Sequence, residues 1–205
     1  MVFIPVGINY DRTIEDRSLL RSLNPEAKRR SLGFVMKTTL GFAIRNFYQM
    51  ARGKWKRFGY ACVNFGDPVS VKELAQRNKI DFKSITKEER FQKIDELCNH
   101  LMLSIQNVIP VLPVALVSSA MLTFEGKPKS LFEIKATIDT MMKEMRSNGA
   151  LIYFPKHNFE KYTETALEML VIRHIVIEQD NLYHTNPDML DILNYYANSI
   201  VHWQE

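Results

Sequence analysis

The sequence predicts an α/β piece over residues 1–80, followed by a mostly α-helical region over residues 81–205. Two segments with strand composition, residues 2–8 and 60–65, fall in the first part, whereas helix-capping patterns and helical periodicity dominate the second. The chain has 205 residues, of which 46% are hydrophobic and 24% charged, so it is long enough to bury a core. The predicted fold class is therefore α/β, with a division near residue 80.

The first part contains two predicted strands joined by a helix. Residues 2–8 are apolar and β-branched, which predicts a buried strand. Pro25 marks the first turn of a long helical segment. Apolar residues at spacings of three or four form one stripe along it: Leu32, Met36, Leu40, Ala43, Phe47 and Ala51. Residues 60–65 form the second strand, which the turn signal Gly66-Asp67-Pro68 ends.

Helix boundaries are well marked from residue 70 onward. Three capping boxes combine a hydroxyl with a glutamate three positions later: Ser70 with Glu73, Thr86 with Glu89, and Ser130 with Glu133. Gly149 is expected to end the third of these helices. Residues 161–177 have a helical pattern, and Asn186-Pro187 is expected to begin a last helix.

Several classes of protein are disfavoured by the sequence. The longest apolar run, residues 108–122, is too short to span a bilayer. The first residues have no basic segment and no cleavage-like site, so a signal peptide is not expected. Cys62 and Cys98 have no metal-type spacing and are expected to be free thiols. We expect no metal and no cofactor, and any membrane role is expected at the surface.

The net charge of +4 is distributed unevenly. Residues 27–66 contain no Asp or Glu. On a helical wheel five basic residues gather within about 100°: Arg30, Lys37, Arg45, Arg52 and Lys56. Phe34 and Tyr48 fall inside this arc. Two interpretations stay open: the arc binds an anionic partner such as a membrane, or it is a solvated face paired with the acidic C-terminal region.

Three collinear segments resemble sequences of the glycerol-3-phosphate acyltransferase family. Residues 3–12, Phe-Ile-Pro-Val-Gly-Ile-Asn-Tyr-Asp-Arg, are similar to that family's fourth motif and its continuation. Residues 59–70 contain Asn-Phe-Gly-Asp-Pro and resemble the strand and turn that follow. Residues 193–202 resemble the C-terminal helix of the bacterial and mitochondrial-type enzymes. The chain therefore resembles the C-terminal portion of such an acyltransferase.

The resemblance implies the end of an acyltransferase α/β domain followed by a helical C-terminal region. It implies transfer of an acyl group from an acyl-CoA or acyl carrier protein thioester to glycerol 3-phosphate in phospholipid synthesis. The expected location is peripheral, at the cytoplasmic face of a membrane. The implied substrate-binding residues are Ile4, Pro5, Val6, Gly7, Tyr10 and Arg12. The alternative interpretation makes the apolar residues strand core and leaves Tyr10 and Arg12 on the surface.

The catalytic pair of the family is missing from this sequence. In the family a histidine and an aspartate, separated by four residues, form the general base. None of the five histidines has an aspartate at that spacing: His100, His157, His174, His184 and His202. We therefore expect no catalytic residue in this chain and place the family's first three motifs upstream of Met1.

Two functions from different classes remain. The first is a part of a glycerol-3-phosphate acyltransferase that is inactive alone. The second is a non-catalytic module that binds an anionic membrane or an acyl carrier protein through its basic helix. Nucleic-acid binding ranks last, because the sequence has no recognised nucleic-acid motif.

Overall fold

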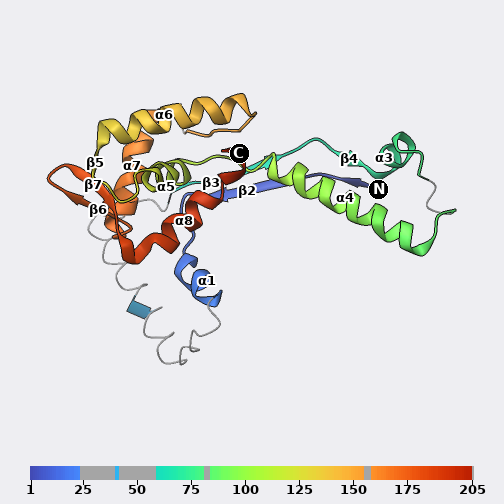
Figure 1. Ribbon diagram of the computed structural model, residues 1–205, viewed down its shortest axis with the longest axis horizontal. Coiled ribbons are helices and arrows are strands. Elements are labelled where there is room, and N and C mark those ends of the chain that lie inside the picture. The colour runs from blue at the N-terminus through green and yellow to red at the C-terminus, as the bar shows by residue number, and fades with distance from the viewer. Residues whose placement is uncertain (24–39, 42–58, 81–83, 155–157, 205) are drawn as a thin grey trace. The chain divides into compact units, whose positions relative to one another are not determined.

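The computed structural model describes residues 1–23, 40–41, 59–80, 84–154 and 158–204 (Figure 1). The chain forms two compact units, of which the larger comprises Met1–Asp11 with Tyr60–Glu205 and the smaller Arg12–Gly59. Helix α1 (Asp16–Ser22) belongs to the smaller unit. The predicted basic arc lies outside the described residues: Arg30, Lys37, Arg45, Arg52 and Lys56.

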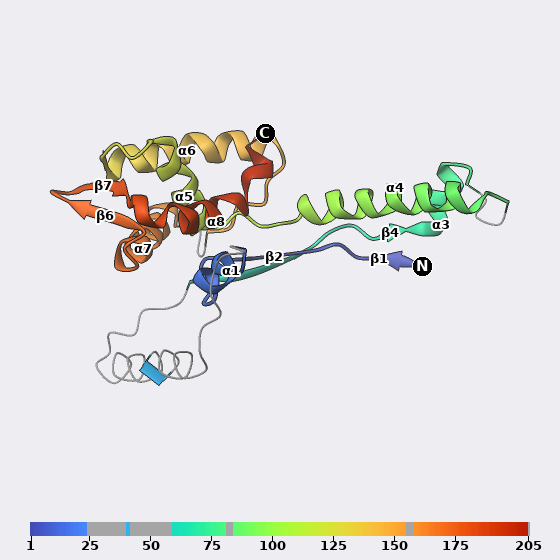
Figure 2. The ribbon, with the colours of Figure 1, turned by 60° about the horizontal axis from the view of Figure 1, so that its bottom comes forward.

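The larger unit contains a two-stranded ribbon. Strand β2 (Val6–Tyr10) pairs antiparallel with β3 (Ala61–Phe65), and β1 (Val2–Phe3) pairs antiparallel with β4 (Val69–Ser70). Figure 2 shows β1 and β2 following each other along one line. The ribbon confirms the strand predicted over residues 60–65.

The prediction that residues 2–8 form a buried strand is wrong. Along β2 the side chains alternate, so that Gly7 and Asn9 are buried while Ile8 is 50% exposed. Ile4 and Val6 are exposed as well, at 59% and 36%. The reason is that successive side chains of a strand point to opposite faces, and the described residues cover only one face of this ribbon. Ile4, Val6 and Ile8 are therefore not core residues of the described structure.

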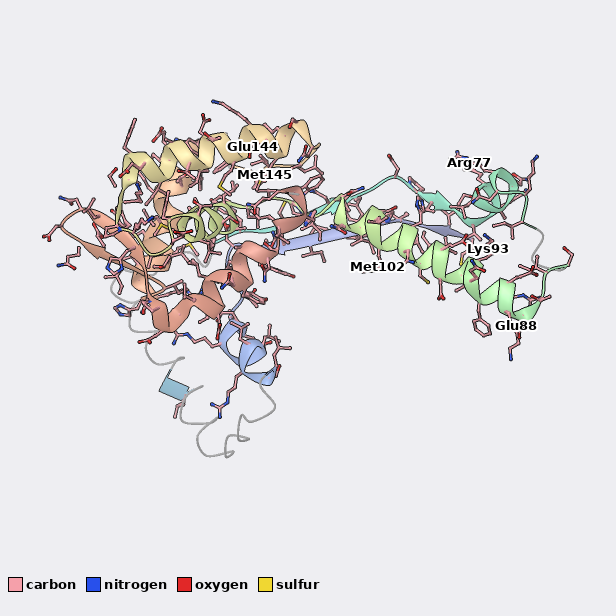
Figure 3. All side chains as sticks on the ribbon, viewed as in Figure 1. Arg77, Glu88, Lys93, Met102, Glu144 and Met145 are labelled. Atoms are coloured by element: carbon pink, nitrogen blue, oxygen red, sulfur yellow. The ribbon has the colours of Figure 1, made fainter. Side chains whose placement is uncertain are left out.

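Helices α3 (Val71–Arg77) and α4 (Lys87–Gln106) follow the ribbon. The hydroxyl of Ser70 accepts a hydrogen bond from the Glu73 amide, and Thr86 and Glu89 form the reciprocal bonds of a capping box. Both predicted helix starts are confirmed. Helix α4 buries none of its residues, and Met102 is 63% exposed on it (Figure 3).

The core of the larger unit is built around α5 (Pro113–Thr123). Residues 113–121 are all buried, and α6 (Leu131–Ser147), α7 (Phe159–Ile172) and α8 (Leu190–Asn198) all contact this helix. A helix that is apolar on every side is stable only when neighbours enclose it. The apolar run of the sequence is therefore a buried core helix. Across the described residues, we find no helix with the length and apolar character that crossing a membrane requires.

Helix α6 follows its predicted boundaries. Ser130 and Glu133 form the predicted capping box at its start. Gly149, with a φ of +88°, follows the last turn in the left-handed conformation that ends many helices. On this helix Met145 is buried and its neighbour Glu144 is exposed (both labelled in Figure 3).

The prediction of a continuous helix over residues 161–177 is wrong at its end. Helix α7 stops at Ile172, and the chain turns into β6 (Val176–Gln179). Asp180 and Asn181 both have positive φ, which is the conformation of a tight hairpin turn, and β7 (Leu182–Thr185) returns beside β6. With β5 (Lys129–Ser130) they form a three-stranded sheet in the order β5-β7-β6. The region after residue 80 is thus mostly helical with one small sheet.

The chain ends in a short 3₁₀ turn, α8 and a second 3₁₀ turn. Asn186 caps the turn Pro187–Met189 as predicted, through its side-chain oxygen and the amide of Asp188. Helix α8 then buries Leu193 completely, while Leu190 on the same helix is 38% exposed. The fold is a mixed α/β structure; the division near residue 80 stays a prediction.

The packing of α8 on α5 supplies a stability test. We expect Leu193→Ala to lower the free energy of unfolding by about 2–5 kcal/mol, because it removes buried methyl groups and leaves a cavity. Leu190→Ala on the same helix is the control, with an expected loss below about 1 kcal/mol. Urea denaturation of both variants measures the difference. Equal losses at the two positions would contradict this packing.

Candidate functional site

The inner face of the ribbon meets the segment that leads from α4 into α5. Gly7 lies against Val108, and a Cβ atom at position 7 would come within 2.4 Å of the Val108 carbonyl oxygen. No side chain fits at that distance, so only glycine permits this approach. The side-chain amide of Asn64 on β3 donates to the same carbonyl at 3.2 Å. Both strands are thereby joined to the entrance of α5.

Asn9 connects three parts of the larger unit. It is 8% exposed, and its Nδ2 donates to the carbonyl of Pro110 at 2.8 Å and to Oγ of Ser199 at 3.2 Å. Pro110 precedes α5, and Ser199 follows α8. Because buried amides need partners, these bonds fix how the ribbon meets the end of α8.

Asp11 ties the end of β2 to the first turn of α5. Its Oδ1 accepts a hydrogen bond from the amide of Val114 at 3.1 Å, and its Oδ2 accepts one from the amide of Tyr60 at 3.1 Å. A carboxylate at a helix N-terminus satisfies an orphan amide and faces the positive end of the helix dipole. Burial nevertheless raises the pKa of Asp11 to about 6, although both backbone hydrogen bonds act in the opposite direction.

A cavity of about 340 Å³ lies beside these contacts. Its lining residues come from β3, from the entrance of α5, and from the end of α6 with the segment that follows: Cys62, Asn64, Pro110, Arg146, Ala150, Leu151, Ile152 and Tyr153. A short parallel bridge between Val111 and Ile152 holds the last two of these segments together. The cavity has the size of a small-ligand site.

The chemistry of this cavity favours binding over catalysis. Its lining contains one cation, Arg146, and no histidine, aspartate or glutamate that could act as a general base. Burial raises the pKa of the Cys62 thiol, so the thiol stays protonated at neutral pH and is a weak nucleophile. In the part of the chain that the structure describes, no group of three or more His, Cys, Asp or Glu side chains could hold a metal ion.

The structure separates the predicted substrate-binding residues. Pro5 and Gly7 are buried on the inner side of the ribbon, whereas Ile4, Val6 and Tyr10 are exposed. Arg12 belongs to the smaller unit. None of the six residues lines the cavity described above. Their role in substrate binding stays a prediction.

The residues of the inner face are not identified in the sequence analysis. Gly7, Asn9 and Asp11 alternate with the apolar residues Ile8 and Tyr10, which is the period of a strand with two different faces. That alternation was available in the sequence. The apolar character of Ile4, Val6 and Ile8 favours the opposite assignment, in which these residues form the buried face.

Comparison with known proteins identifies similar sequences over nearly the whole chain. The model of a family described as the glycerol-3-phosphate acyltransferase C-terminal region matches residues 44–204. Relatives named glycerol-3-phosphate acyltransferase include those of Alteromonas mediterranea, 24% identical over 211 residues, and Hamiltonella defensa, 22% identical over 222 residues. The alignments cover 97% and 98% of this chain but 24% and 25% of those relatives. The chain thus spans about a quarter of their length.

The buried carboxyl of Asp11 predicts a pH-dependent stability. Because its pKa is raised from 3.8 to about 6 in the folded state, the folded protein binds this proton more tightly than the unfolded chain. The contribution of Asp11 to the free energy of unfolding is therefore greatest below pH 3.8, and about 3 kcal/mol of it is lost as the pH rises through about 6.

We expect Asp11→Asn to remove this part of the pH dependence, since an amide does not titrate. Asn also leaves one of the two backbone amides without an acceptor, so it lowers stability at low pH, where Asp11 is uncharged. The measurement is the free energy of unfolding in urea at pH values between 4 and 7, with Asp67→Asn in the exposed turn as the control. An unchanged pH slope in Asp11→Asn would contradict the burial of a titrating carboxyl.

Proposed function

This chain belongs to the glycerol-3-phosphate acyltransferase family, in which it matches the C-terminal region. We propose that it works as one part of such an enzyme. The family match over residues 44–204 carries this proposal. The proposed reaction is the transfer of an acyl group from a thioester donor, acyl-CoA or acyl carrier protein, to glycerol 3-phosphate in phospholipid synthesis. The catalytic histidine and aspartate come from acyltransferase sequence outside this chain.

The contacts of the ribbon support a role in positioning. Asp11 and Asn9 fix the strand segment to the helices of the same unit, so the residues that resemble the fourth motif have a rigid support. In the assembled enzyme, the pocket for the acceptor and the acyl chain is shaped by Ile4, Pro5, Val6 and Gly7. Tyr10 and Arg12 contact the phosphate group of the acceptor, glycerol 3-phosphate. The complete pocket requires the remaining acyltransferase sequence, because Ile4, Val6 and Tyr10 face outward and the described residues supply no opposite wall.

A chimeric enzyme tests the proposal. We expect this chain, substituted for the aligned quarter of the Alteromonas mediterranea relative, to support acylation of glycerol 3-phosphate by acyl-CoA. The isolated chain should have no activity, since loss of a general base removes about 10²–10⁴ in rate. The control is the relative with only the aligned quarter deleted. A chimera no more active than this control, or turnover by the isolated chain, would contradict the proposal.

The second candidate is binding of an anionic membrane surface, which the charge segregation of residues 27–66 favours. Five basic residues at an anionic bilayer contribute about 1 kcal/mol each, screened beyond about 8 Å at physiological salt. The same residues could instead contact an acidic acyl carrier protein. Either interaction brings the chain to the site of its acyl donor or product, at the cytoplasmic surface of a membrane.

Liposome sedimentation distinguishes this interaction from internal charge pairing. We expect binding that increases with the fraction of anionic lipid and decreases with salt, and that is lost in Arg45→Glu with Arg52→Glu. Lys72→Glu with Lys79→Glu, outside the basic arc, is the charge-matched control. If the arc variant still sediments with anionic liposomes, the basic arc is not the contact.

A further inference from the structure

The outer face of the ribbon is an apolar surface that no described residue covers. It is formed by cross-strand pairs in which Val6 lies opposite Phe65 and Ile8 lies opposite Val63. Phe65 is 72% exposed, Ile8 50% and Val63 47%. The remaining outward positions are Ile4, Tyr10 and Ala61. None of the seven residues carries a charge.

This composition is that of a buried sheet face. β-branched and aromatic residues in directly opposed pairs stabilise sheets by packing against a covering layer. Among the described residues, β2 and β3 pair only with each other, so each strand has one edge without a strand partner. A two-stranded ribbon with free edges is marginally stable in water and invites further pairing. The inner face already has its cover in Val108 and Pro110.

We infer that this outer face, together with the adjacent strand edges, is the surface on which the rest of an acyltransferase packs. The inference rests on the proposed function and names the partner: the three quarters of the relatives' length that this chain does not match. That partner would supply apolar side chains over Ile8, Val63 and Phe65, and a strand beside β2 or β3. Burying such a face is the main favourable term in assembling two such pieces.

The charge pattern distinguishes this partner from a lipid surface. Peripheral membrane faces combine apolar residues with Lys or Arg, which the anionic headgroups attract. The outward positions of the ribbon carry no Lys or Arg. The face therefore matches a protein interior, in which uncharged pairs are enclosed on all sides.

A thiol-accessibility experiment tests the contact directly. Cys62 and Cys98 are replaced by serine, and Phe65→Cys is compared with Leu103→Cys, which lies on exposed α4. We expect the Phe65→Cys thiol to react at least about 10-fold more slowly in the chimera with the Alteromonas mediterranea relative than in the isolated chain, because burial restricts access of the reagent. The Leu103→Cys thiol should react at the same rate in both.

A charge substitution provides the second test. Ile8→Glu places an unpaired charge in the proposed contact, so acylation by the chimera should fall about 100-fold. Leu103→Glu should leave the activity unchanged. The isolated Ile8→Glu chain should keep its thermal unfolding midpoint, because position 8 is exposed there. That result excludes simple misfolding as the cause of lost activity.

The outcomes separate the two proposals. An inactive parent chimera contradicts the proposed function, and the thiol experiment still reports on the face. An active chimera in which Phe65→Cys reacts as fast as in the isolated chain overturns the inference. Slow reaction already in the isolated chain also overturns it. Two further measurements then identify what covers the face instead. Self-association in sedimentation velocity that Ile8→Glu abolishes would identify a second copy of this chain. Binding to neutral vesicles that Ile8→Glu abolishes would identify a lipid surface.

Discussion

The carboxyl of Asp11 must be satisfied inside the protein, and it takes its partners from residues far away in the sequence. The two amides that donate to it belong to Tyr60 and Val114, which are 49 and 103 positions away. These bonds join the ends of both ribbon strands to the first turn of α5. Because α5 is the helix that α6, α7 and α8 contact, the placement of the ribbon on the core depends on this interaction. Satisfying a buried carboxyl in this way costs stability when it ionises, and the raised pKa reflects that cost.

The same constraint fixes the register of the ribbon. Asp11 and Asn9 must face inward to meet their partners, and Gly7 must face inward because no side chain fits against Val108. A strand has a period of two, so these positions force Val6, Ile8 and Tyr10 outward. The uncovered apolar face is therefore a consequence of the polar contacts on the inner face. The site and the proposed contact surface are two sides of one strand.

Local signals predicted the helix boundaries well, and the reason is that capping involves only neighbouring residues. Ser130 with Glu133, and Thr86 with Glu89, satisfy orphan amides within a single turn, so the sequence alone specifies them. The helical pattern predicted over residues 161–177 runs into the start of β6, so the sequence does not predict the hairpin that turns at Asp180 and Asn181. Two consecutive residues that tolerate positive φ, between segments containing Val, Ile and Tyr, were the available signal.

The sequence by itself determined the family resemblance, the segment of strand at residues 60–65, and the starts of α4 and α6. Each of these depends on residue identity or on contacts within a few positions of the chain. Only the tertiary structure decided which face of β2 is buried, because both faces offer plausible sets, one apolar and one polar. The choice was made by Pro110, Val114 and Ser199, which lie more than 100 residues away and provide the hydrogen-bond partners that Asn9 and Asp11 require. These partners allow the polar face to be buried without leaving an unsatisfied group, and the period of the strand then leaves the apolar face outward.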